Sequence, residues 1–268
     1  MAFSTTKKDE SALLGVFSLE EKENETIYDV IGRMETILSY CSRTGQHAGV
    51  VPFLETYYLV TKNVAERHLE NNLYFKNFTK LEELDVFFAS LFFNPAKDYF
   101  NGQLTSELWK TYFEYCSKKD GRPFLQMLLG INVHINADLV TSLSFLNYRE
   151  RRDYLVINKI LNETIPEVLT FLAFGKMDII GFGGIFLKKI FRNEFRRVIV
   201  RWRTDAWKNA EYVKSDKEKL KNYQEQISEQ TEDINRKLIA LFDHPYRFRT
   251  LWNILQRIHK LQVRIRRH

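Results

Sequence analysis

The chain has 268 residues, of which 44% are hydrophobic and 21 are Phe, so one large core is possible. Its 11 Gly and 5 Pro are too few for the frequent turns of a many-stranded sheet protein, and two isolated cysteines, Cys41 and Cys116, do not indicate a disulfide framework. The net charge of +6 comes from the segment after Tyr246, because the rest of the chain holds 33 basic and 34 acidic residues.

The first 20 residues are polar and lack the apolar stretch of a secretory signal, so we expect a flexible N-terminus. Apolar residues then recur at helical spacing, which predicts four helices, at about 27–41, 54–68, 81–93 and 108–116. We expect Asn94-Pro95 to end the third of these helices, because a proline disfavours helical backbone in the residue before it.

Pro123 suits a first helical turn and predicts a helix that contains Leu128–Val140. Asp153 is a predicted N-cap for a helix that reaches about Asn162, and the capping box Thr164–Glu167 predicts that a separate helix begins there. Glycines at 181–184 predict a break, and a further helix is expected at 195–206. No run of 18 apolar residues occurs, so we expect a cytoplasmic protein without a membrane span.

The last part of the chain is charged. Residues 214–233 keep only a narrow apolar stripe, which predicts a long exposed helix or one arm of a helical hairpin, and a final helix after Pro245 has one basic face. Together these elements predict an all-α fold, a single bundle of roughly eight to ten helices around a central polar-lined helix. We expect a core domain at 21–213, followed at 214–268 by a charged helical hairpin and a basic C-terminal helix packed on the core.

The segment Leu128–Val140 is apolar overall, yet it contains Asn132, His134, Asn136 and Asp138. Residues four apart lie one above the other on a helix, so His134 and Asp138 share a face, with Gly130 one turn before them. Glycine costs a helix interior up to ~1 kcal/mol relative to alanine, which suggests a close approach by another group. Because the segment has no Lys or Glu, its polar residues are expected to face an enclosed pocket.

Two interpretations of these polar residues remain open. A buried carboxylate or imidazole must be paired, hydrogen-bonded or bound to a metal. In the structural interpretation, Asp138 accepts hydrogen bonds from a neighbouring helix and His134 is a satisfied core histidine. In the functional interpretation, the two residues bind a divalent transition metal (Zn, Fe or Mn) or act as an acid–base pair on a substrate.

Further polar residues are candidate partners for this pair. Asp85 falls on the apolar face of its own helix, Asp153 begins a later helix, and Glu211 shares a predicted helix with Arg203 and Asp205. In the functional interpretation, Asp85 and Asp153 complete a metal site with His134 and Asp138, and Glu211 is a third catalytic residue. Asn132, Asn136 and Asn158 are expected to support the site. The HxxxD spacing alone is a weak metal signal, since no HExxH or CxxC motif accompanies it.

An ordered set of segments resembles one known family. The segment LLGINVHINADL resembles the GMNAHINxDL segment of DUF5995, an uncharacterised all-helical family, and further pieces agree in order: IGRMETIL, VVPFLETYYLVTKNV, FKNFTKLEELDVFFASLFF, DYLVINKIL and RTDAWKNAEYV. The resemblance covers about Ile31 to Val213, and the segment after Lys214 is expected to lie outside it. Where the family has Arg-Tyr after its LDVxFA motif, this chain has Leu91-Phe92.

The resemblance implies the fold and the place of the site, but no reaction. The positions that the family pattern marks are Asp85, His134, Asn136, Asp138, Asp153, Asn158, Trp207 and Glu211. This adds Trp207 to the supporting residues.

We therefore expect a metal-assisted enzyme, hydrolase-like, that acts on a small apolar or amphipathic substrate and uses metal-bound water as its nucleophile. The alternative is a non-catalytic helical module that binds an apolar ligand, or an anionic membrane surface through residues 165–203 and the basic tail. Nucleic acid is poorly supported, because no reading motif occurs and the chain before the tail is nearly neutral. The sequence does not indicate an oligomeric state.

Overall fold

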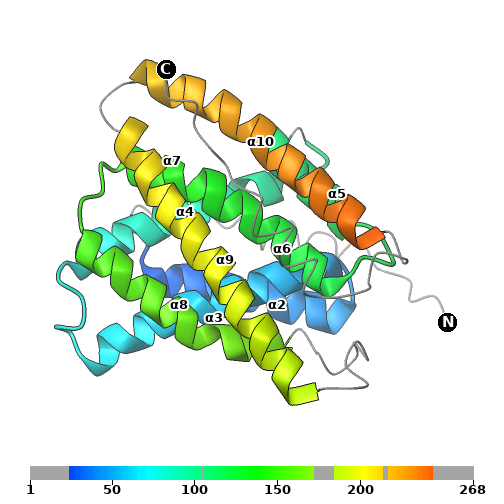
Figure 1. Cartoon of the computed structure of the whole chain (residues 1–268), viewed down its shortest axis with the longest axis horizontal. Coiled ribbons are helices and arrows are strands. Elements are labelled where there is room, and N and C mark those ends of the chain that lie inside the picture. The colour runs from blue at the N-terminus through cyan, green and yellow to red at the C-terminus, as the bar shows by residue number, and fades with distance from the viewer. Residues whose placement is uncertain (1–23, 104, 172–183, 214–216, 244–268) are drawn as a thin grey trace.

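A computed structural model describes residues 24–103, 105–171, 184–213 and 217–243, and every regular element in these ranges is helical (Figure 1). This confirms the predicted all-α bundle. The helices are α2 (Ile27–Thr44), a short 3-10 helix η1 (Ala48–Val50), α3 (Val51–Glu70), α4 (Phe78–Phe100), α5 (Glu107–Cys116), α6 (Pro123–Val133), the π-helical segment η2 (His134–Asp138), α7 (Leu139–Phe145), α8 (Arg151–Phe171), α9 (Gly184–Val213) and α10 (Lys217–Asp243). The predicted flexible N-terminus, the glycines at 181–183 and the basic C-terminal helix lie outside the described residues.

The central element is the continuous rod formed by α6, η2 and α7. Every residue from Phe124 to Val140 is buried, so the rod is enclosed on all sides, as expected for a helix that has apolar residues on every side and no exposed polar face. In Figure 1 it runs through the bundle behind α9, with α3 on its other side. Helix α6 contacts α3, α5 and α10, whereas η2 contacts α4, α9 and α10.

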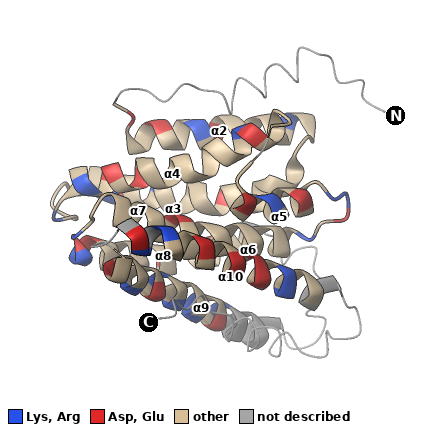
Figure 2. Cartoon of the chain, turned by 90° about the horizontal axis from the view of Figure 1, so that it is seen from above, with Lys and Arg blue, Asp and Glu red and all other residues tan. Residues whose placement is uncertain are grey.

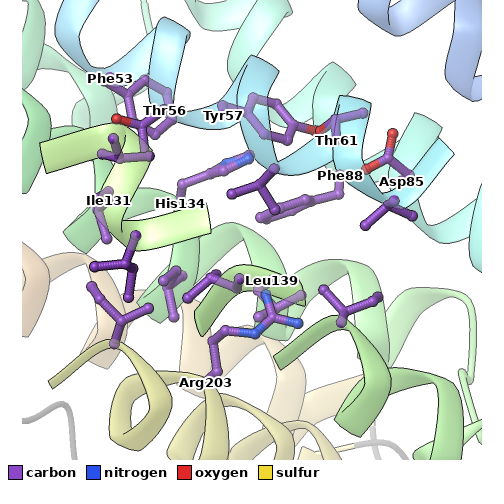
Figure 3. A pocket seen from close by; sticks show the side chains of 18 of the residues that line it. Phe53, Thr56, Tyr57, Thr61, Asp85, Phe88, Ile131, His134, Leu139 and Arg203 are labelled. Carbon is purple, nitrogen blue, oxygen red and sulfur yellow. The ribbon is translucent and has the colours of Figure 1, made fainter. Parts of the chain in front are cut away.

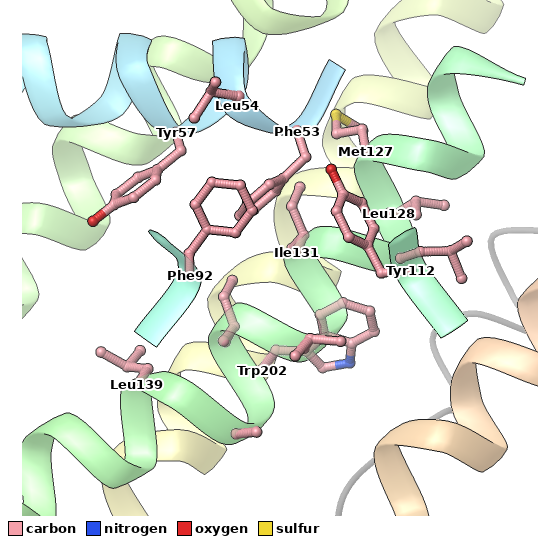
Figure 4. Close-up of a cluster of buried hydrophobic side chains, with 14 of the residues drawn as sticks. Phe53, Leu54, Tyr57, Phe92, Tyr112, Met127, Leu128, Ile131, Leu139 and Trp202 are labelled. Atoms are coloured by element: carbon pink, nitrogen blue, oxygen red, sulfur yellow. The ribbon is translucent and has the colours of Figure 1, made fainter. Parts of the chain in front are cut away.

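An aromatic cluster packs against this rod (Figure 4). The ring of Phe53 from α3 meets Phe92 and Tyr112 edge-on, at centroid distances of 5.2 and 5.7 Å, and lies tilted to Trp109 at 5.6 Å. A Cβ added to Gly130 of α6 would lie 2.5 Å from Cγ of Phe53. The predicted close approach at Gly130 is therefore confirmed, and the approaching group is the Phe53 ring.

Helix α10 belongs to the same packed body. Its apolar stripe is buried against α5, α6 and η2 through Tyr223, Ile227, Ile234 and Leu238. Charged residues lie along its outer side and along α9, whereas α6 carries no charged residue (Figure 2). None of the described helices is long and apolar enough to cross a membrane.

Pro95 does not end α4, contrary to the sequence prediction. The helix continues to Phe100, and its buried face extends across the proline from Phe92 and Phe93 to Ala96. The Thr105 hydroxyl donates to the carbonyl oxygen of Pro95 over 2.8 Å. Packing of this face outweighs the ~3 kcal/mol that an interior proline costs a helix.

Pro166 lies inside α8 for the same reason, so the predicted helix start at Thr164 is also wrong. Thr164 does not cap a helix. Its hydroxyl donates to the Ile160 carbonyl over 2.9 Å and accepts a hydrogen bond from the Asn63 amide. The buried face of α8 continues past the proline through Val168 and Leu169.

Candidate ligand-binding cavity

The rod changes from α to π geometry at the polar segment singled out in the sequence. Residues His134–Asp138 form the π-helical turn, and the Leu139 N–H donates to the His134 carbonyl five residues earlier. Such single π turns inside α-helices occur frequently at functional sites. The turn holds His134 Nδ1 2.9 Å from Asp138 Oδ2, so the expected pairing of these two side chains is present.

Beside this turn lies a partly enclosed cavity of about 110 Å³ (Figure 3). Its walls come from α3, α4, α6, η2, α7, α8 and α9, and they are apolar almost throughout. Typical lining residues are Val60, Leu84, Leu139, Leu161 and Ile199. An apolar cavity of ~150 Å³ can bind benzene, so a space of this order accepts a small hydrocarbon body.

Four polar atoms on one side of the cavity are buried and make no hydrogen bond of good geometry to a described residue, although the hydroxyls of Tyr57 and Thr61 lie close enough for a weak mutual contact. The four atoms are Tyr57 Oη and Thr61 Oγ1 from α3, Asp85 Oδ2 from α4 and His134 Nε2 from η2. Figure 3 shows these four residues around the upper part of the space, between α3 and the rod. Since most buried polar atoms in folded proteins are hydrogen-bonded, four unpaired atoms at one cavity require an explanation.

Burial controls the charge of the groups on this wall. It raises the pKa of Asp85 to about 7, with the negative charge of Glu82 acting in the same direction. It also raises the pKa of Tyr57 well above its usual value, and Asp85 adds to that shift. Near neutral pH, Tyr57 is therefore uncharged and the carboxyl group of Asp85 is close to half protonated.

The His134–Asp138 pair is also held in its uncharged forms. Burial, and secondarily the positive charge of Arg203, lower the pKa of His134 well below its usual value. Burial raises the pKa of Asp138 well above its usual value, and the indole of Trp109 opposes this shift. The His134 ring is stacked on Phe88, with ring centroids 3.5 Å apart, and meets Tyr57 edge-on at 4.7 Å. This packing fixes the imidazole plane at the cavity wall.

Arg203 of α9 lines another side of the cavity and is only 6% exposed. Its Nε donates to Asn158 Oδ1, and its guanidinium lies 4.7 Å from the ring centroid of Tyr154. The Tyr154 hydroxyl in turn donates to the Arg203 carbonyl oxygen. Asn158, predicted as a supporting residue, thus orients an arginine at the cavity.

Two predicted site residues lie away from the cavity. Both carboxylate oxygens of Asp153 accept backbone N–H groups, from Lys76 and Asn77, at 2.8 Å each, so this fully buried acid ties the loop before α4 to α8. Glu211 is exposed on α9 and does not line the cavity, because it lies on the outer side of the helix. The prediction that these residues join His134 is therefore corrected.

The remaining predicted residues serve packing. The Asn132 amide donates to the Thr231 carbonyl at 3.1 Å and to Asn235 Oδ1 at 2.9 Å, and its oxygen accepts a hydrogen bond from Asn136. The asparagines thus join α6 and η2 to α10. Trp207 packs against Tyr148 and Tyr154 at 6.4 and 4.8 Å, and these contacts hold α9 on α8 and the loop before it.

The predicted metal ligands do not converge. His134 Nδ1 is engaged by Asp138, and both oxygens of Asp153 are engaged by backbone N–H groups. Across the described ranges, no three His, Cys, Asp or Glu side chains lie close enough together to hold a metal ion. Asp85 and His134 line the cavity as hydrogen-bonding groups in an apolar wall.

Sequence reasoning missed Tyr57 and Thr61 as site residues and proposed Arg203 only as a partner for a buried acid. Tyr57 and Thr61 are one helical turn apart on an apolar stripe, so their polar tips face the same space. That spacing was a usable signal. Nothing in the sequence shows that Arg203 is directed at this cavity, because that depends on how α9 packs.

Fold and cavity together define an all-helical protein with a small apolar chamber beside a π-helical turn. The chain belongs to a family of unknown function, DUF5995, whose sequence profile matches residues 27–241. The match includes α10, so the expectation that the family ends before residue 214 is corrected. No curated protein and no solved structure matches the chain.

Proposed function

We propose that this domain binds a small, largely apolar molecule in the cavity between the rod and helices α3, α4, α8 and α9. The observation that carries the proposal is the group of four unpaired buried polar atoms, from Tyr57, Thr61, Asp85 and His134, on the wall of an otherwise apolar space. Each unpaired buried polar atom costs about 1–3 kcal/mol, a large amount against a net stability of ~5–15 kcal/mol. A bound molecule with a polar group offsets that cost.

Hexanol is a suitable probe because it combines a short hydrocarbon body with one hydroxyl group. We expect saturable binding of hexanol to the full chain in a ligand-observed NMR titration. The variant Val168→Phe places a larger side chain in the cavity, since Val168 is buried in α8 and lines it. It should abolish hexanol binding and leave the protein folded.

The matched control is Val198→Phe. Val198 is equally buried, in α9, but does not line the cavity, so the larger side chain has no space and should lower the free energy of unfolding by about 1–3 kcal/mol. Where this variant remains folded, it should still bind hexanol. Absence of hexanol binding to the wild-type protein, or equal binding by Val168→Phe, would contradict the proposal.

A second candidate, acid–base chemistry on the bound molecule, is favoured by one observation. Asp138 fixes the His134 ring through Nδ1 and leaves Nε2 unpaired at the cavity wall. A carboxyl group that orients an imidazole in this way is typical of hydrolytic enzymes. In this candidate function, the uncharged Asp138 donates its proton in a hydrogen bond to Nδ1, so His134 Nε2 carries a hydrogen and donates it to the carbonyl oxygen of the substrate while water attacks the carbonyl carbon and passes its proton to the leaving group.

The test uses ethyl acetate, an ester with as few heavy atoms as benzene, and its hydrolysis is followed by NMR. We expect hydrolysis above the background rate with the wild-type protein. His134→Gln should remove this activity, and Glu211→Gln should leave it unchanged because Glu211 is exposed away from the cavity. Equal rates for His134→Gln and wild type would exclude the acid–base role while leaving the binding proposal intact.

A further inference from the structure

We infer that the molecule bound in the cavity is a monocarboxylate, whose carboxylate group pairs with the Arg203 guanidinium while its apolar body crosses the cavity and a polar group at its far end meets the unpaired polar atoms on the wall toward α3 and α4. This inference rests on the proposed binding function and specifies the ligand class. It is carried by the position, the burial and the hydrogen-bonding of one arginine.

Arg203 is a buried charge with no counter-charge in the described residues. Its side chain is 94% buried by area, and no described carboxylate forms an ion pair with it. Arginine stays protonated in proteins. A buried charge without a partner is strongly unfavourable, so an anion at this position would stabilise the folded protein.

The surroundings of Arg203 orient its guanidinium for a ligand. Asn158 accepts a hydrogen bond from Nε, and the Tyr154 ring supports the guanidinium from one side. These contacts leave the two terminal guanidinium nitrogens of Arg203 able to donate hydrogen bonds to another acceptor. Figure 3 shows the side chain rising from α9 into the space below Leu139 and His134. Two terminal N–H groups in one plane match the two oxygens of a carboxylate.

The rest of the cavity restricts the anion to a small monoanion. Arg203 is the only Lys or Arg among the residues that line the described cavity. A phosphate dianion would need more donors than one guanidinium supplies, and it would also face the partly ionised Asp85. The apolar walls, among them Leu161 and Ile165 of α8, accept a hydrocarbon body attached to the carboxylate.

Hexanoate and hexanol distinguish this inference from the general binding proposal, because they share a hydrocarbon body and differ in the head group. We expect the wild-type chain to bind hexanoate about tenfold more tightly than hexanol in parallel NMR titrations near neutral pH, since hydrogen bonds to charged groups contribute more than neutral ones. Arg203→Met, which keeps the length and removes the charge, should abolish this preference.

Two further variants keep the test decisive. Arg196→Met removes an exposed arginine of the same helix and should retain the full preference for hexanoate. Arg203→Lys keeps the charge but loses the planar pair of donors, so the preference should fall several-fold. If Arg203→Met does not fold, the test relies on Arg203→Lys and on the comparison of hexanoate with hexanol in the wild-type protein.

The outcomes separate the two proposals. Binding of hexanol and hexanoate with equal affinity, or an unchanged preference in the Arg203 variants, would overturn the carboxylate inference and leave the cavity as a binding site. Failure of both compounds to bind would overturn the binding function itself, and the inference with it.

Discussion

The central rod has polar side chains on two sides, and the two sides differ in how those side chains are satisfied. Toward α10, Asn132 and Asn136 bond to each other and to Thr231 and Asn235, and the Tyr223 hydroxyl donates to the Asn136 carbonyl at 3.0 Å. On the α10 helix itself, Thr231 Oγ1 and Asn235 Nδ2 are buried without a hydrogen-bond partner in the described structure. Toward the cavity, His134 presents a nitrogen that has no partner in the described structure. Residues two positions apart thus serve different purposes.

The same division separates two of the three acids predicted to bind a metal. Asp153 has a backbone donor for each oxygen, whereas one oxygen of Asp85 is buried without a partner. We call Asn132, Asn136 and Asp153 the closed set, and Tyr57, Thr61, Asp85 and His134 the open set. The closed set is expected to stabilise the fold, and the open set to reduce stability in exchange for a binding surface.

The largest expected effect is at Asp153, in the closed set. Asp153→Ala removes the acceptors of the Lys76 and Asn77 N–H groups and should lower the free energy of unfolding by about 3–5 kcal/mol, measured by urea denaturation. Asp153→Asn keeps one acceptor, so it should lower the free energy of unfolding by about half as much. Hexanol affinity that changes in Asp153→Asn without a loss of stability would place this residue in the open set.

A pH-dependent effect is expected at Asp85, in the open set. Because burial raises its pKa from 3.8 to about 7, the native state binds this proton more tightly than the unfolded chain does. Its contribution to stability is therefore present at low pH and is lost as the pH rises toward about 7.

Asp85→Asn mimics the protonated carboxyl group and should remove this loss. At about pH 8 the variant should be more stable than wild type by about 2–4 kcal/mol, and near pH 4 the two should be equal. Urea denaturation at both pH values measures the difference. Asp153→Asn, as a control, should be less stable than wild type at both. An Asp85→Asn variant that is less stable at about pH 8 would show that the carboxylate has a partner.

The fold was largely predictable from the sequence, because helical periodicity depends on burial of one face. The stripe of α10 and the start of α6 at Pro123 follow this rule. Pro95 and Pro166 were wrongly predicted to mark boundaries, since a local rule about proline does not include the packing of the residues that follow it, such as Ala96 and Val168. Tertiary packing decided both cases.

The site was predictable only in part. His134 and Asp138 were found because their residue types conflict with an apolar segment, and Asp85 was found for the same reason. Asp153 conflicts with its surroundings equally, yet it lies in the closed set, because its partners are backbone N–H groups of a loop far along the chain. A buried acid in a sequence therefore indicates that a partner exists, but not whether the protein supplies it.

A smaller effect tests the packing that forms the cavity wall. Gly130→Ala places a Cβ against the Phe53 ring, which lines the cavity, and should lower the free energy of unfolding by about 1–3 kcal/mol. In Gly32→Ala of α2, the added Cβ meets no atom within 4 Å, so this substitution should raise the free energy of unfolding by up to ~1 kcal/mol. Thermal unfolding of both variants measures the contrast. Stabilisation by both would show that Phe53 can move away from the rod.

The smallest expected effect gives the most direct contrast between the two sets, because it uses one chemical change at two buried tyrosines. Tyr223→Phe removes a hydroxyl that donates to the Asn136 carbonyl, so the free energy of unfolding should fall by about 1 kcal/mol. Tyr57→Phe removes a buried hydroxyl that makes only a weak contact with the Thr61 hydroxyl, so the free energy of unfolding should stay unchanged or rise by up to about 0.5 kcal/mol.

Urea denaturation of the two tyrosine variants in parallel measures the signs, and a hexanoate titration adds an independent comparison. Only Tyr57→Phe should change ligand affinity, because Tyr223 lies on the α10 side of the rod and does not line the cavity. A loss of stability in both variants would mean that the Tyr57 hydroxyl is satisfied within the protein. Tyr57, which lies between α3 and the His134 ring, would then leave the open set. The argument for a ligand would rest on Asp85, His134 and Arg203 alone.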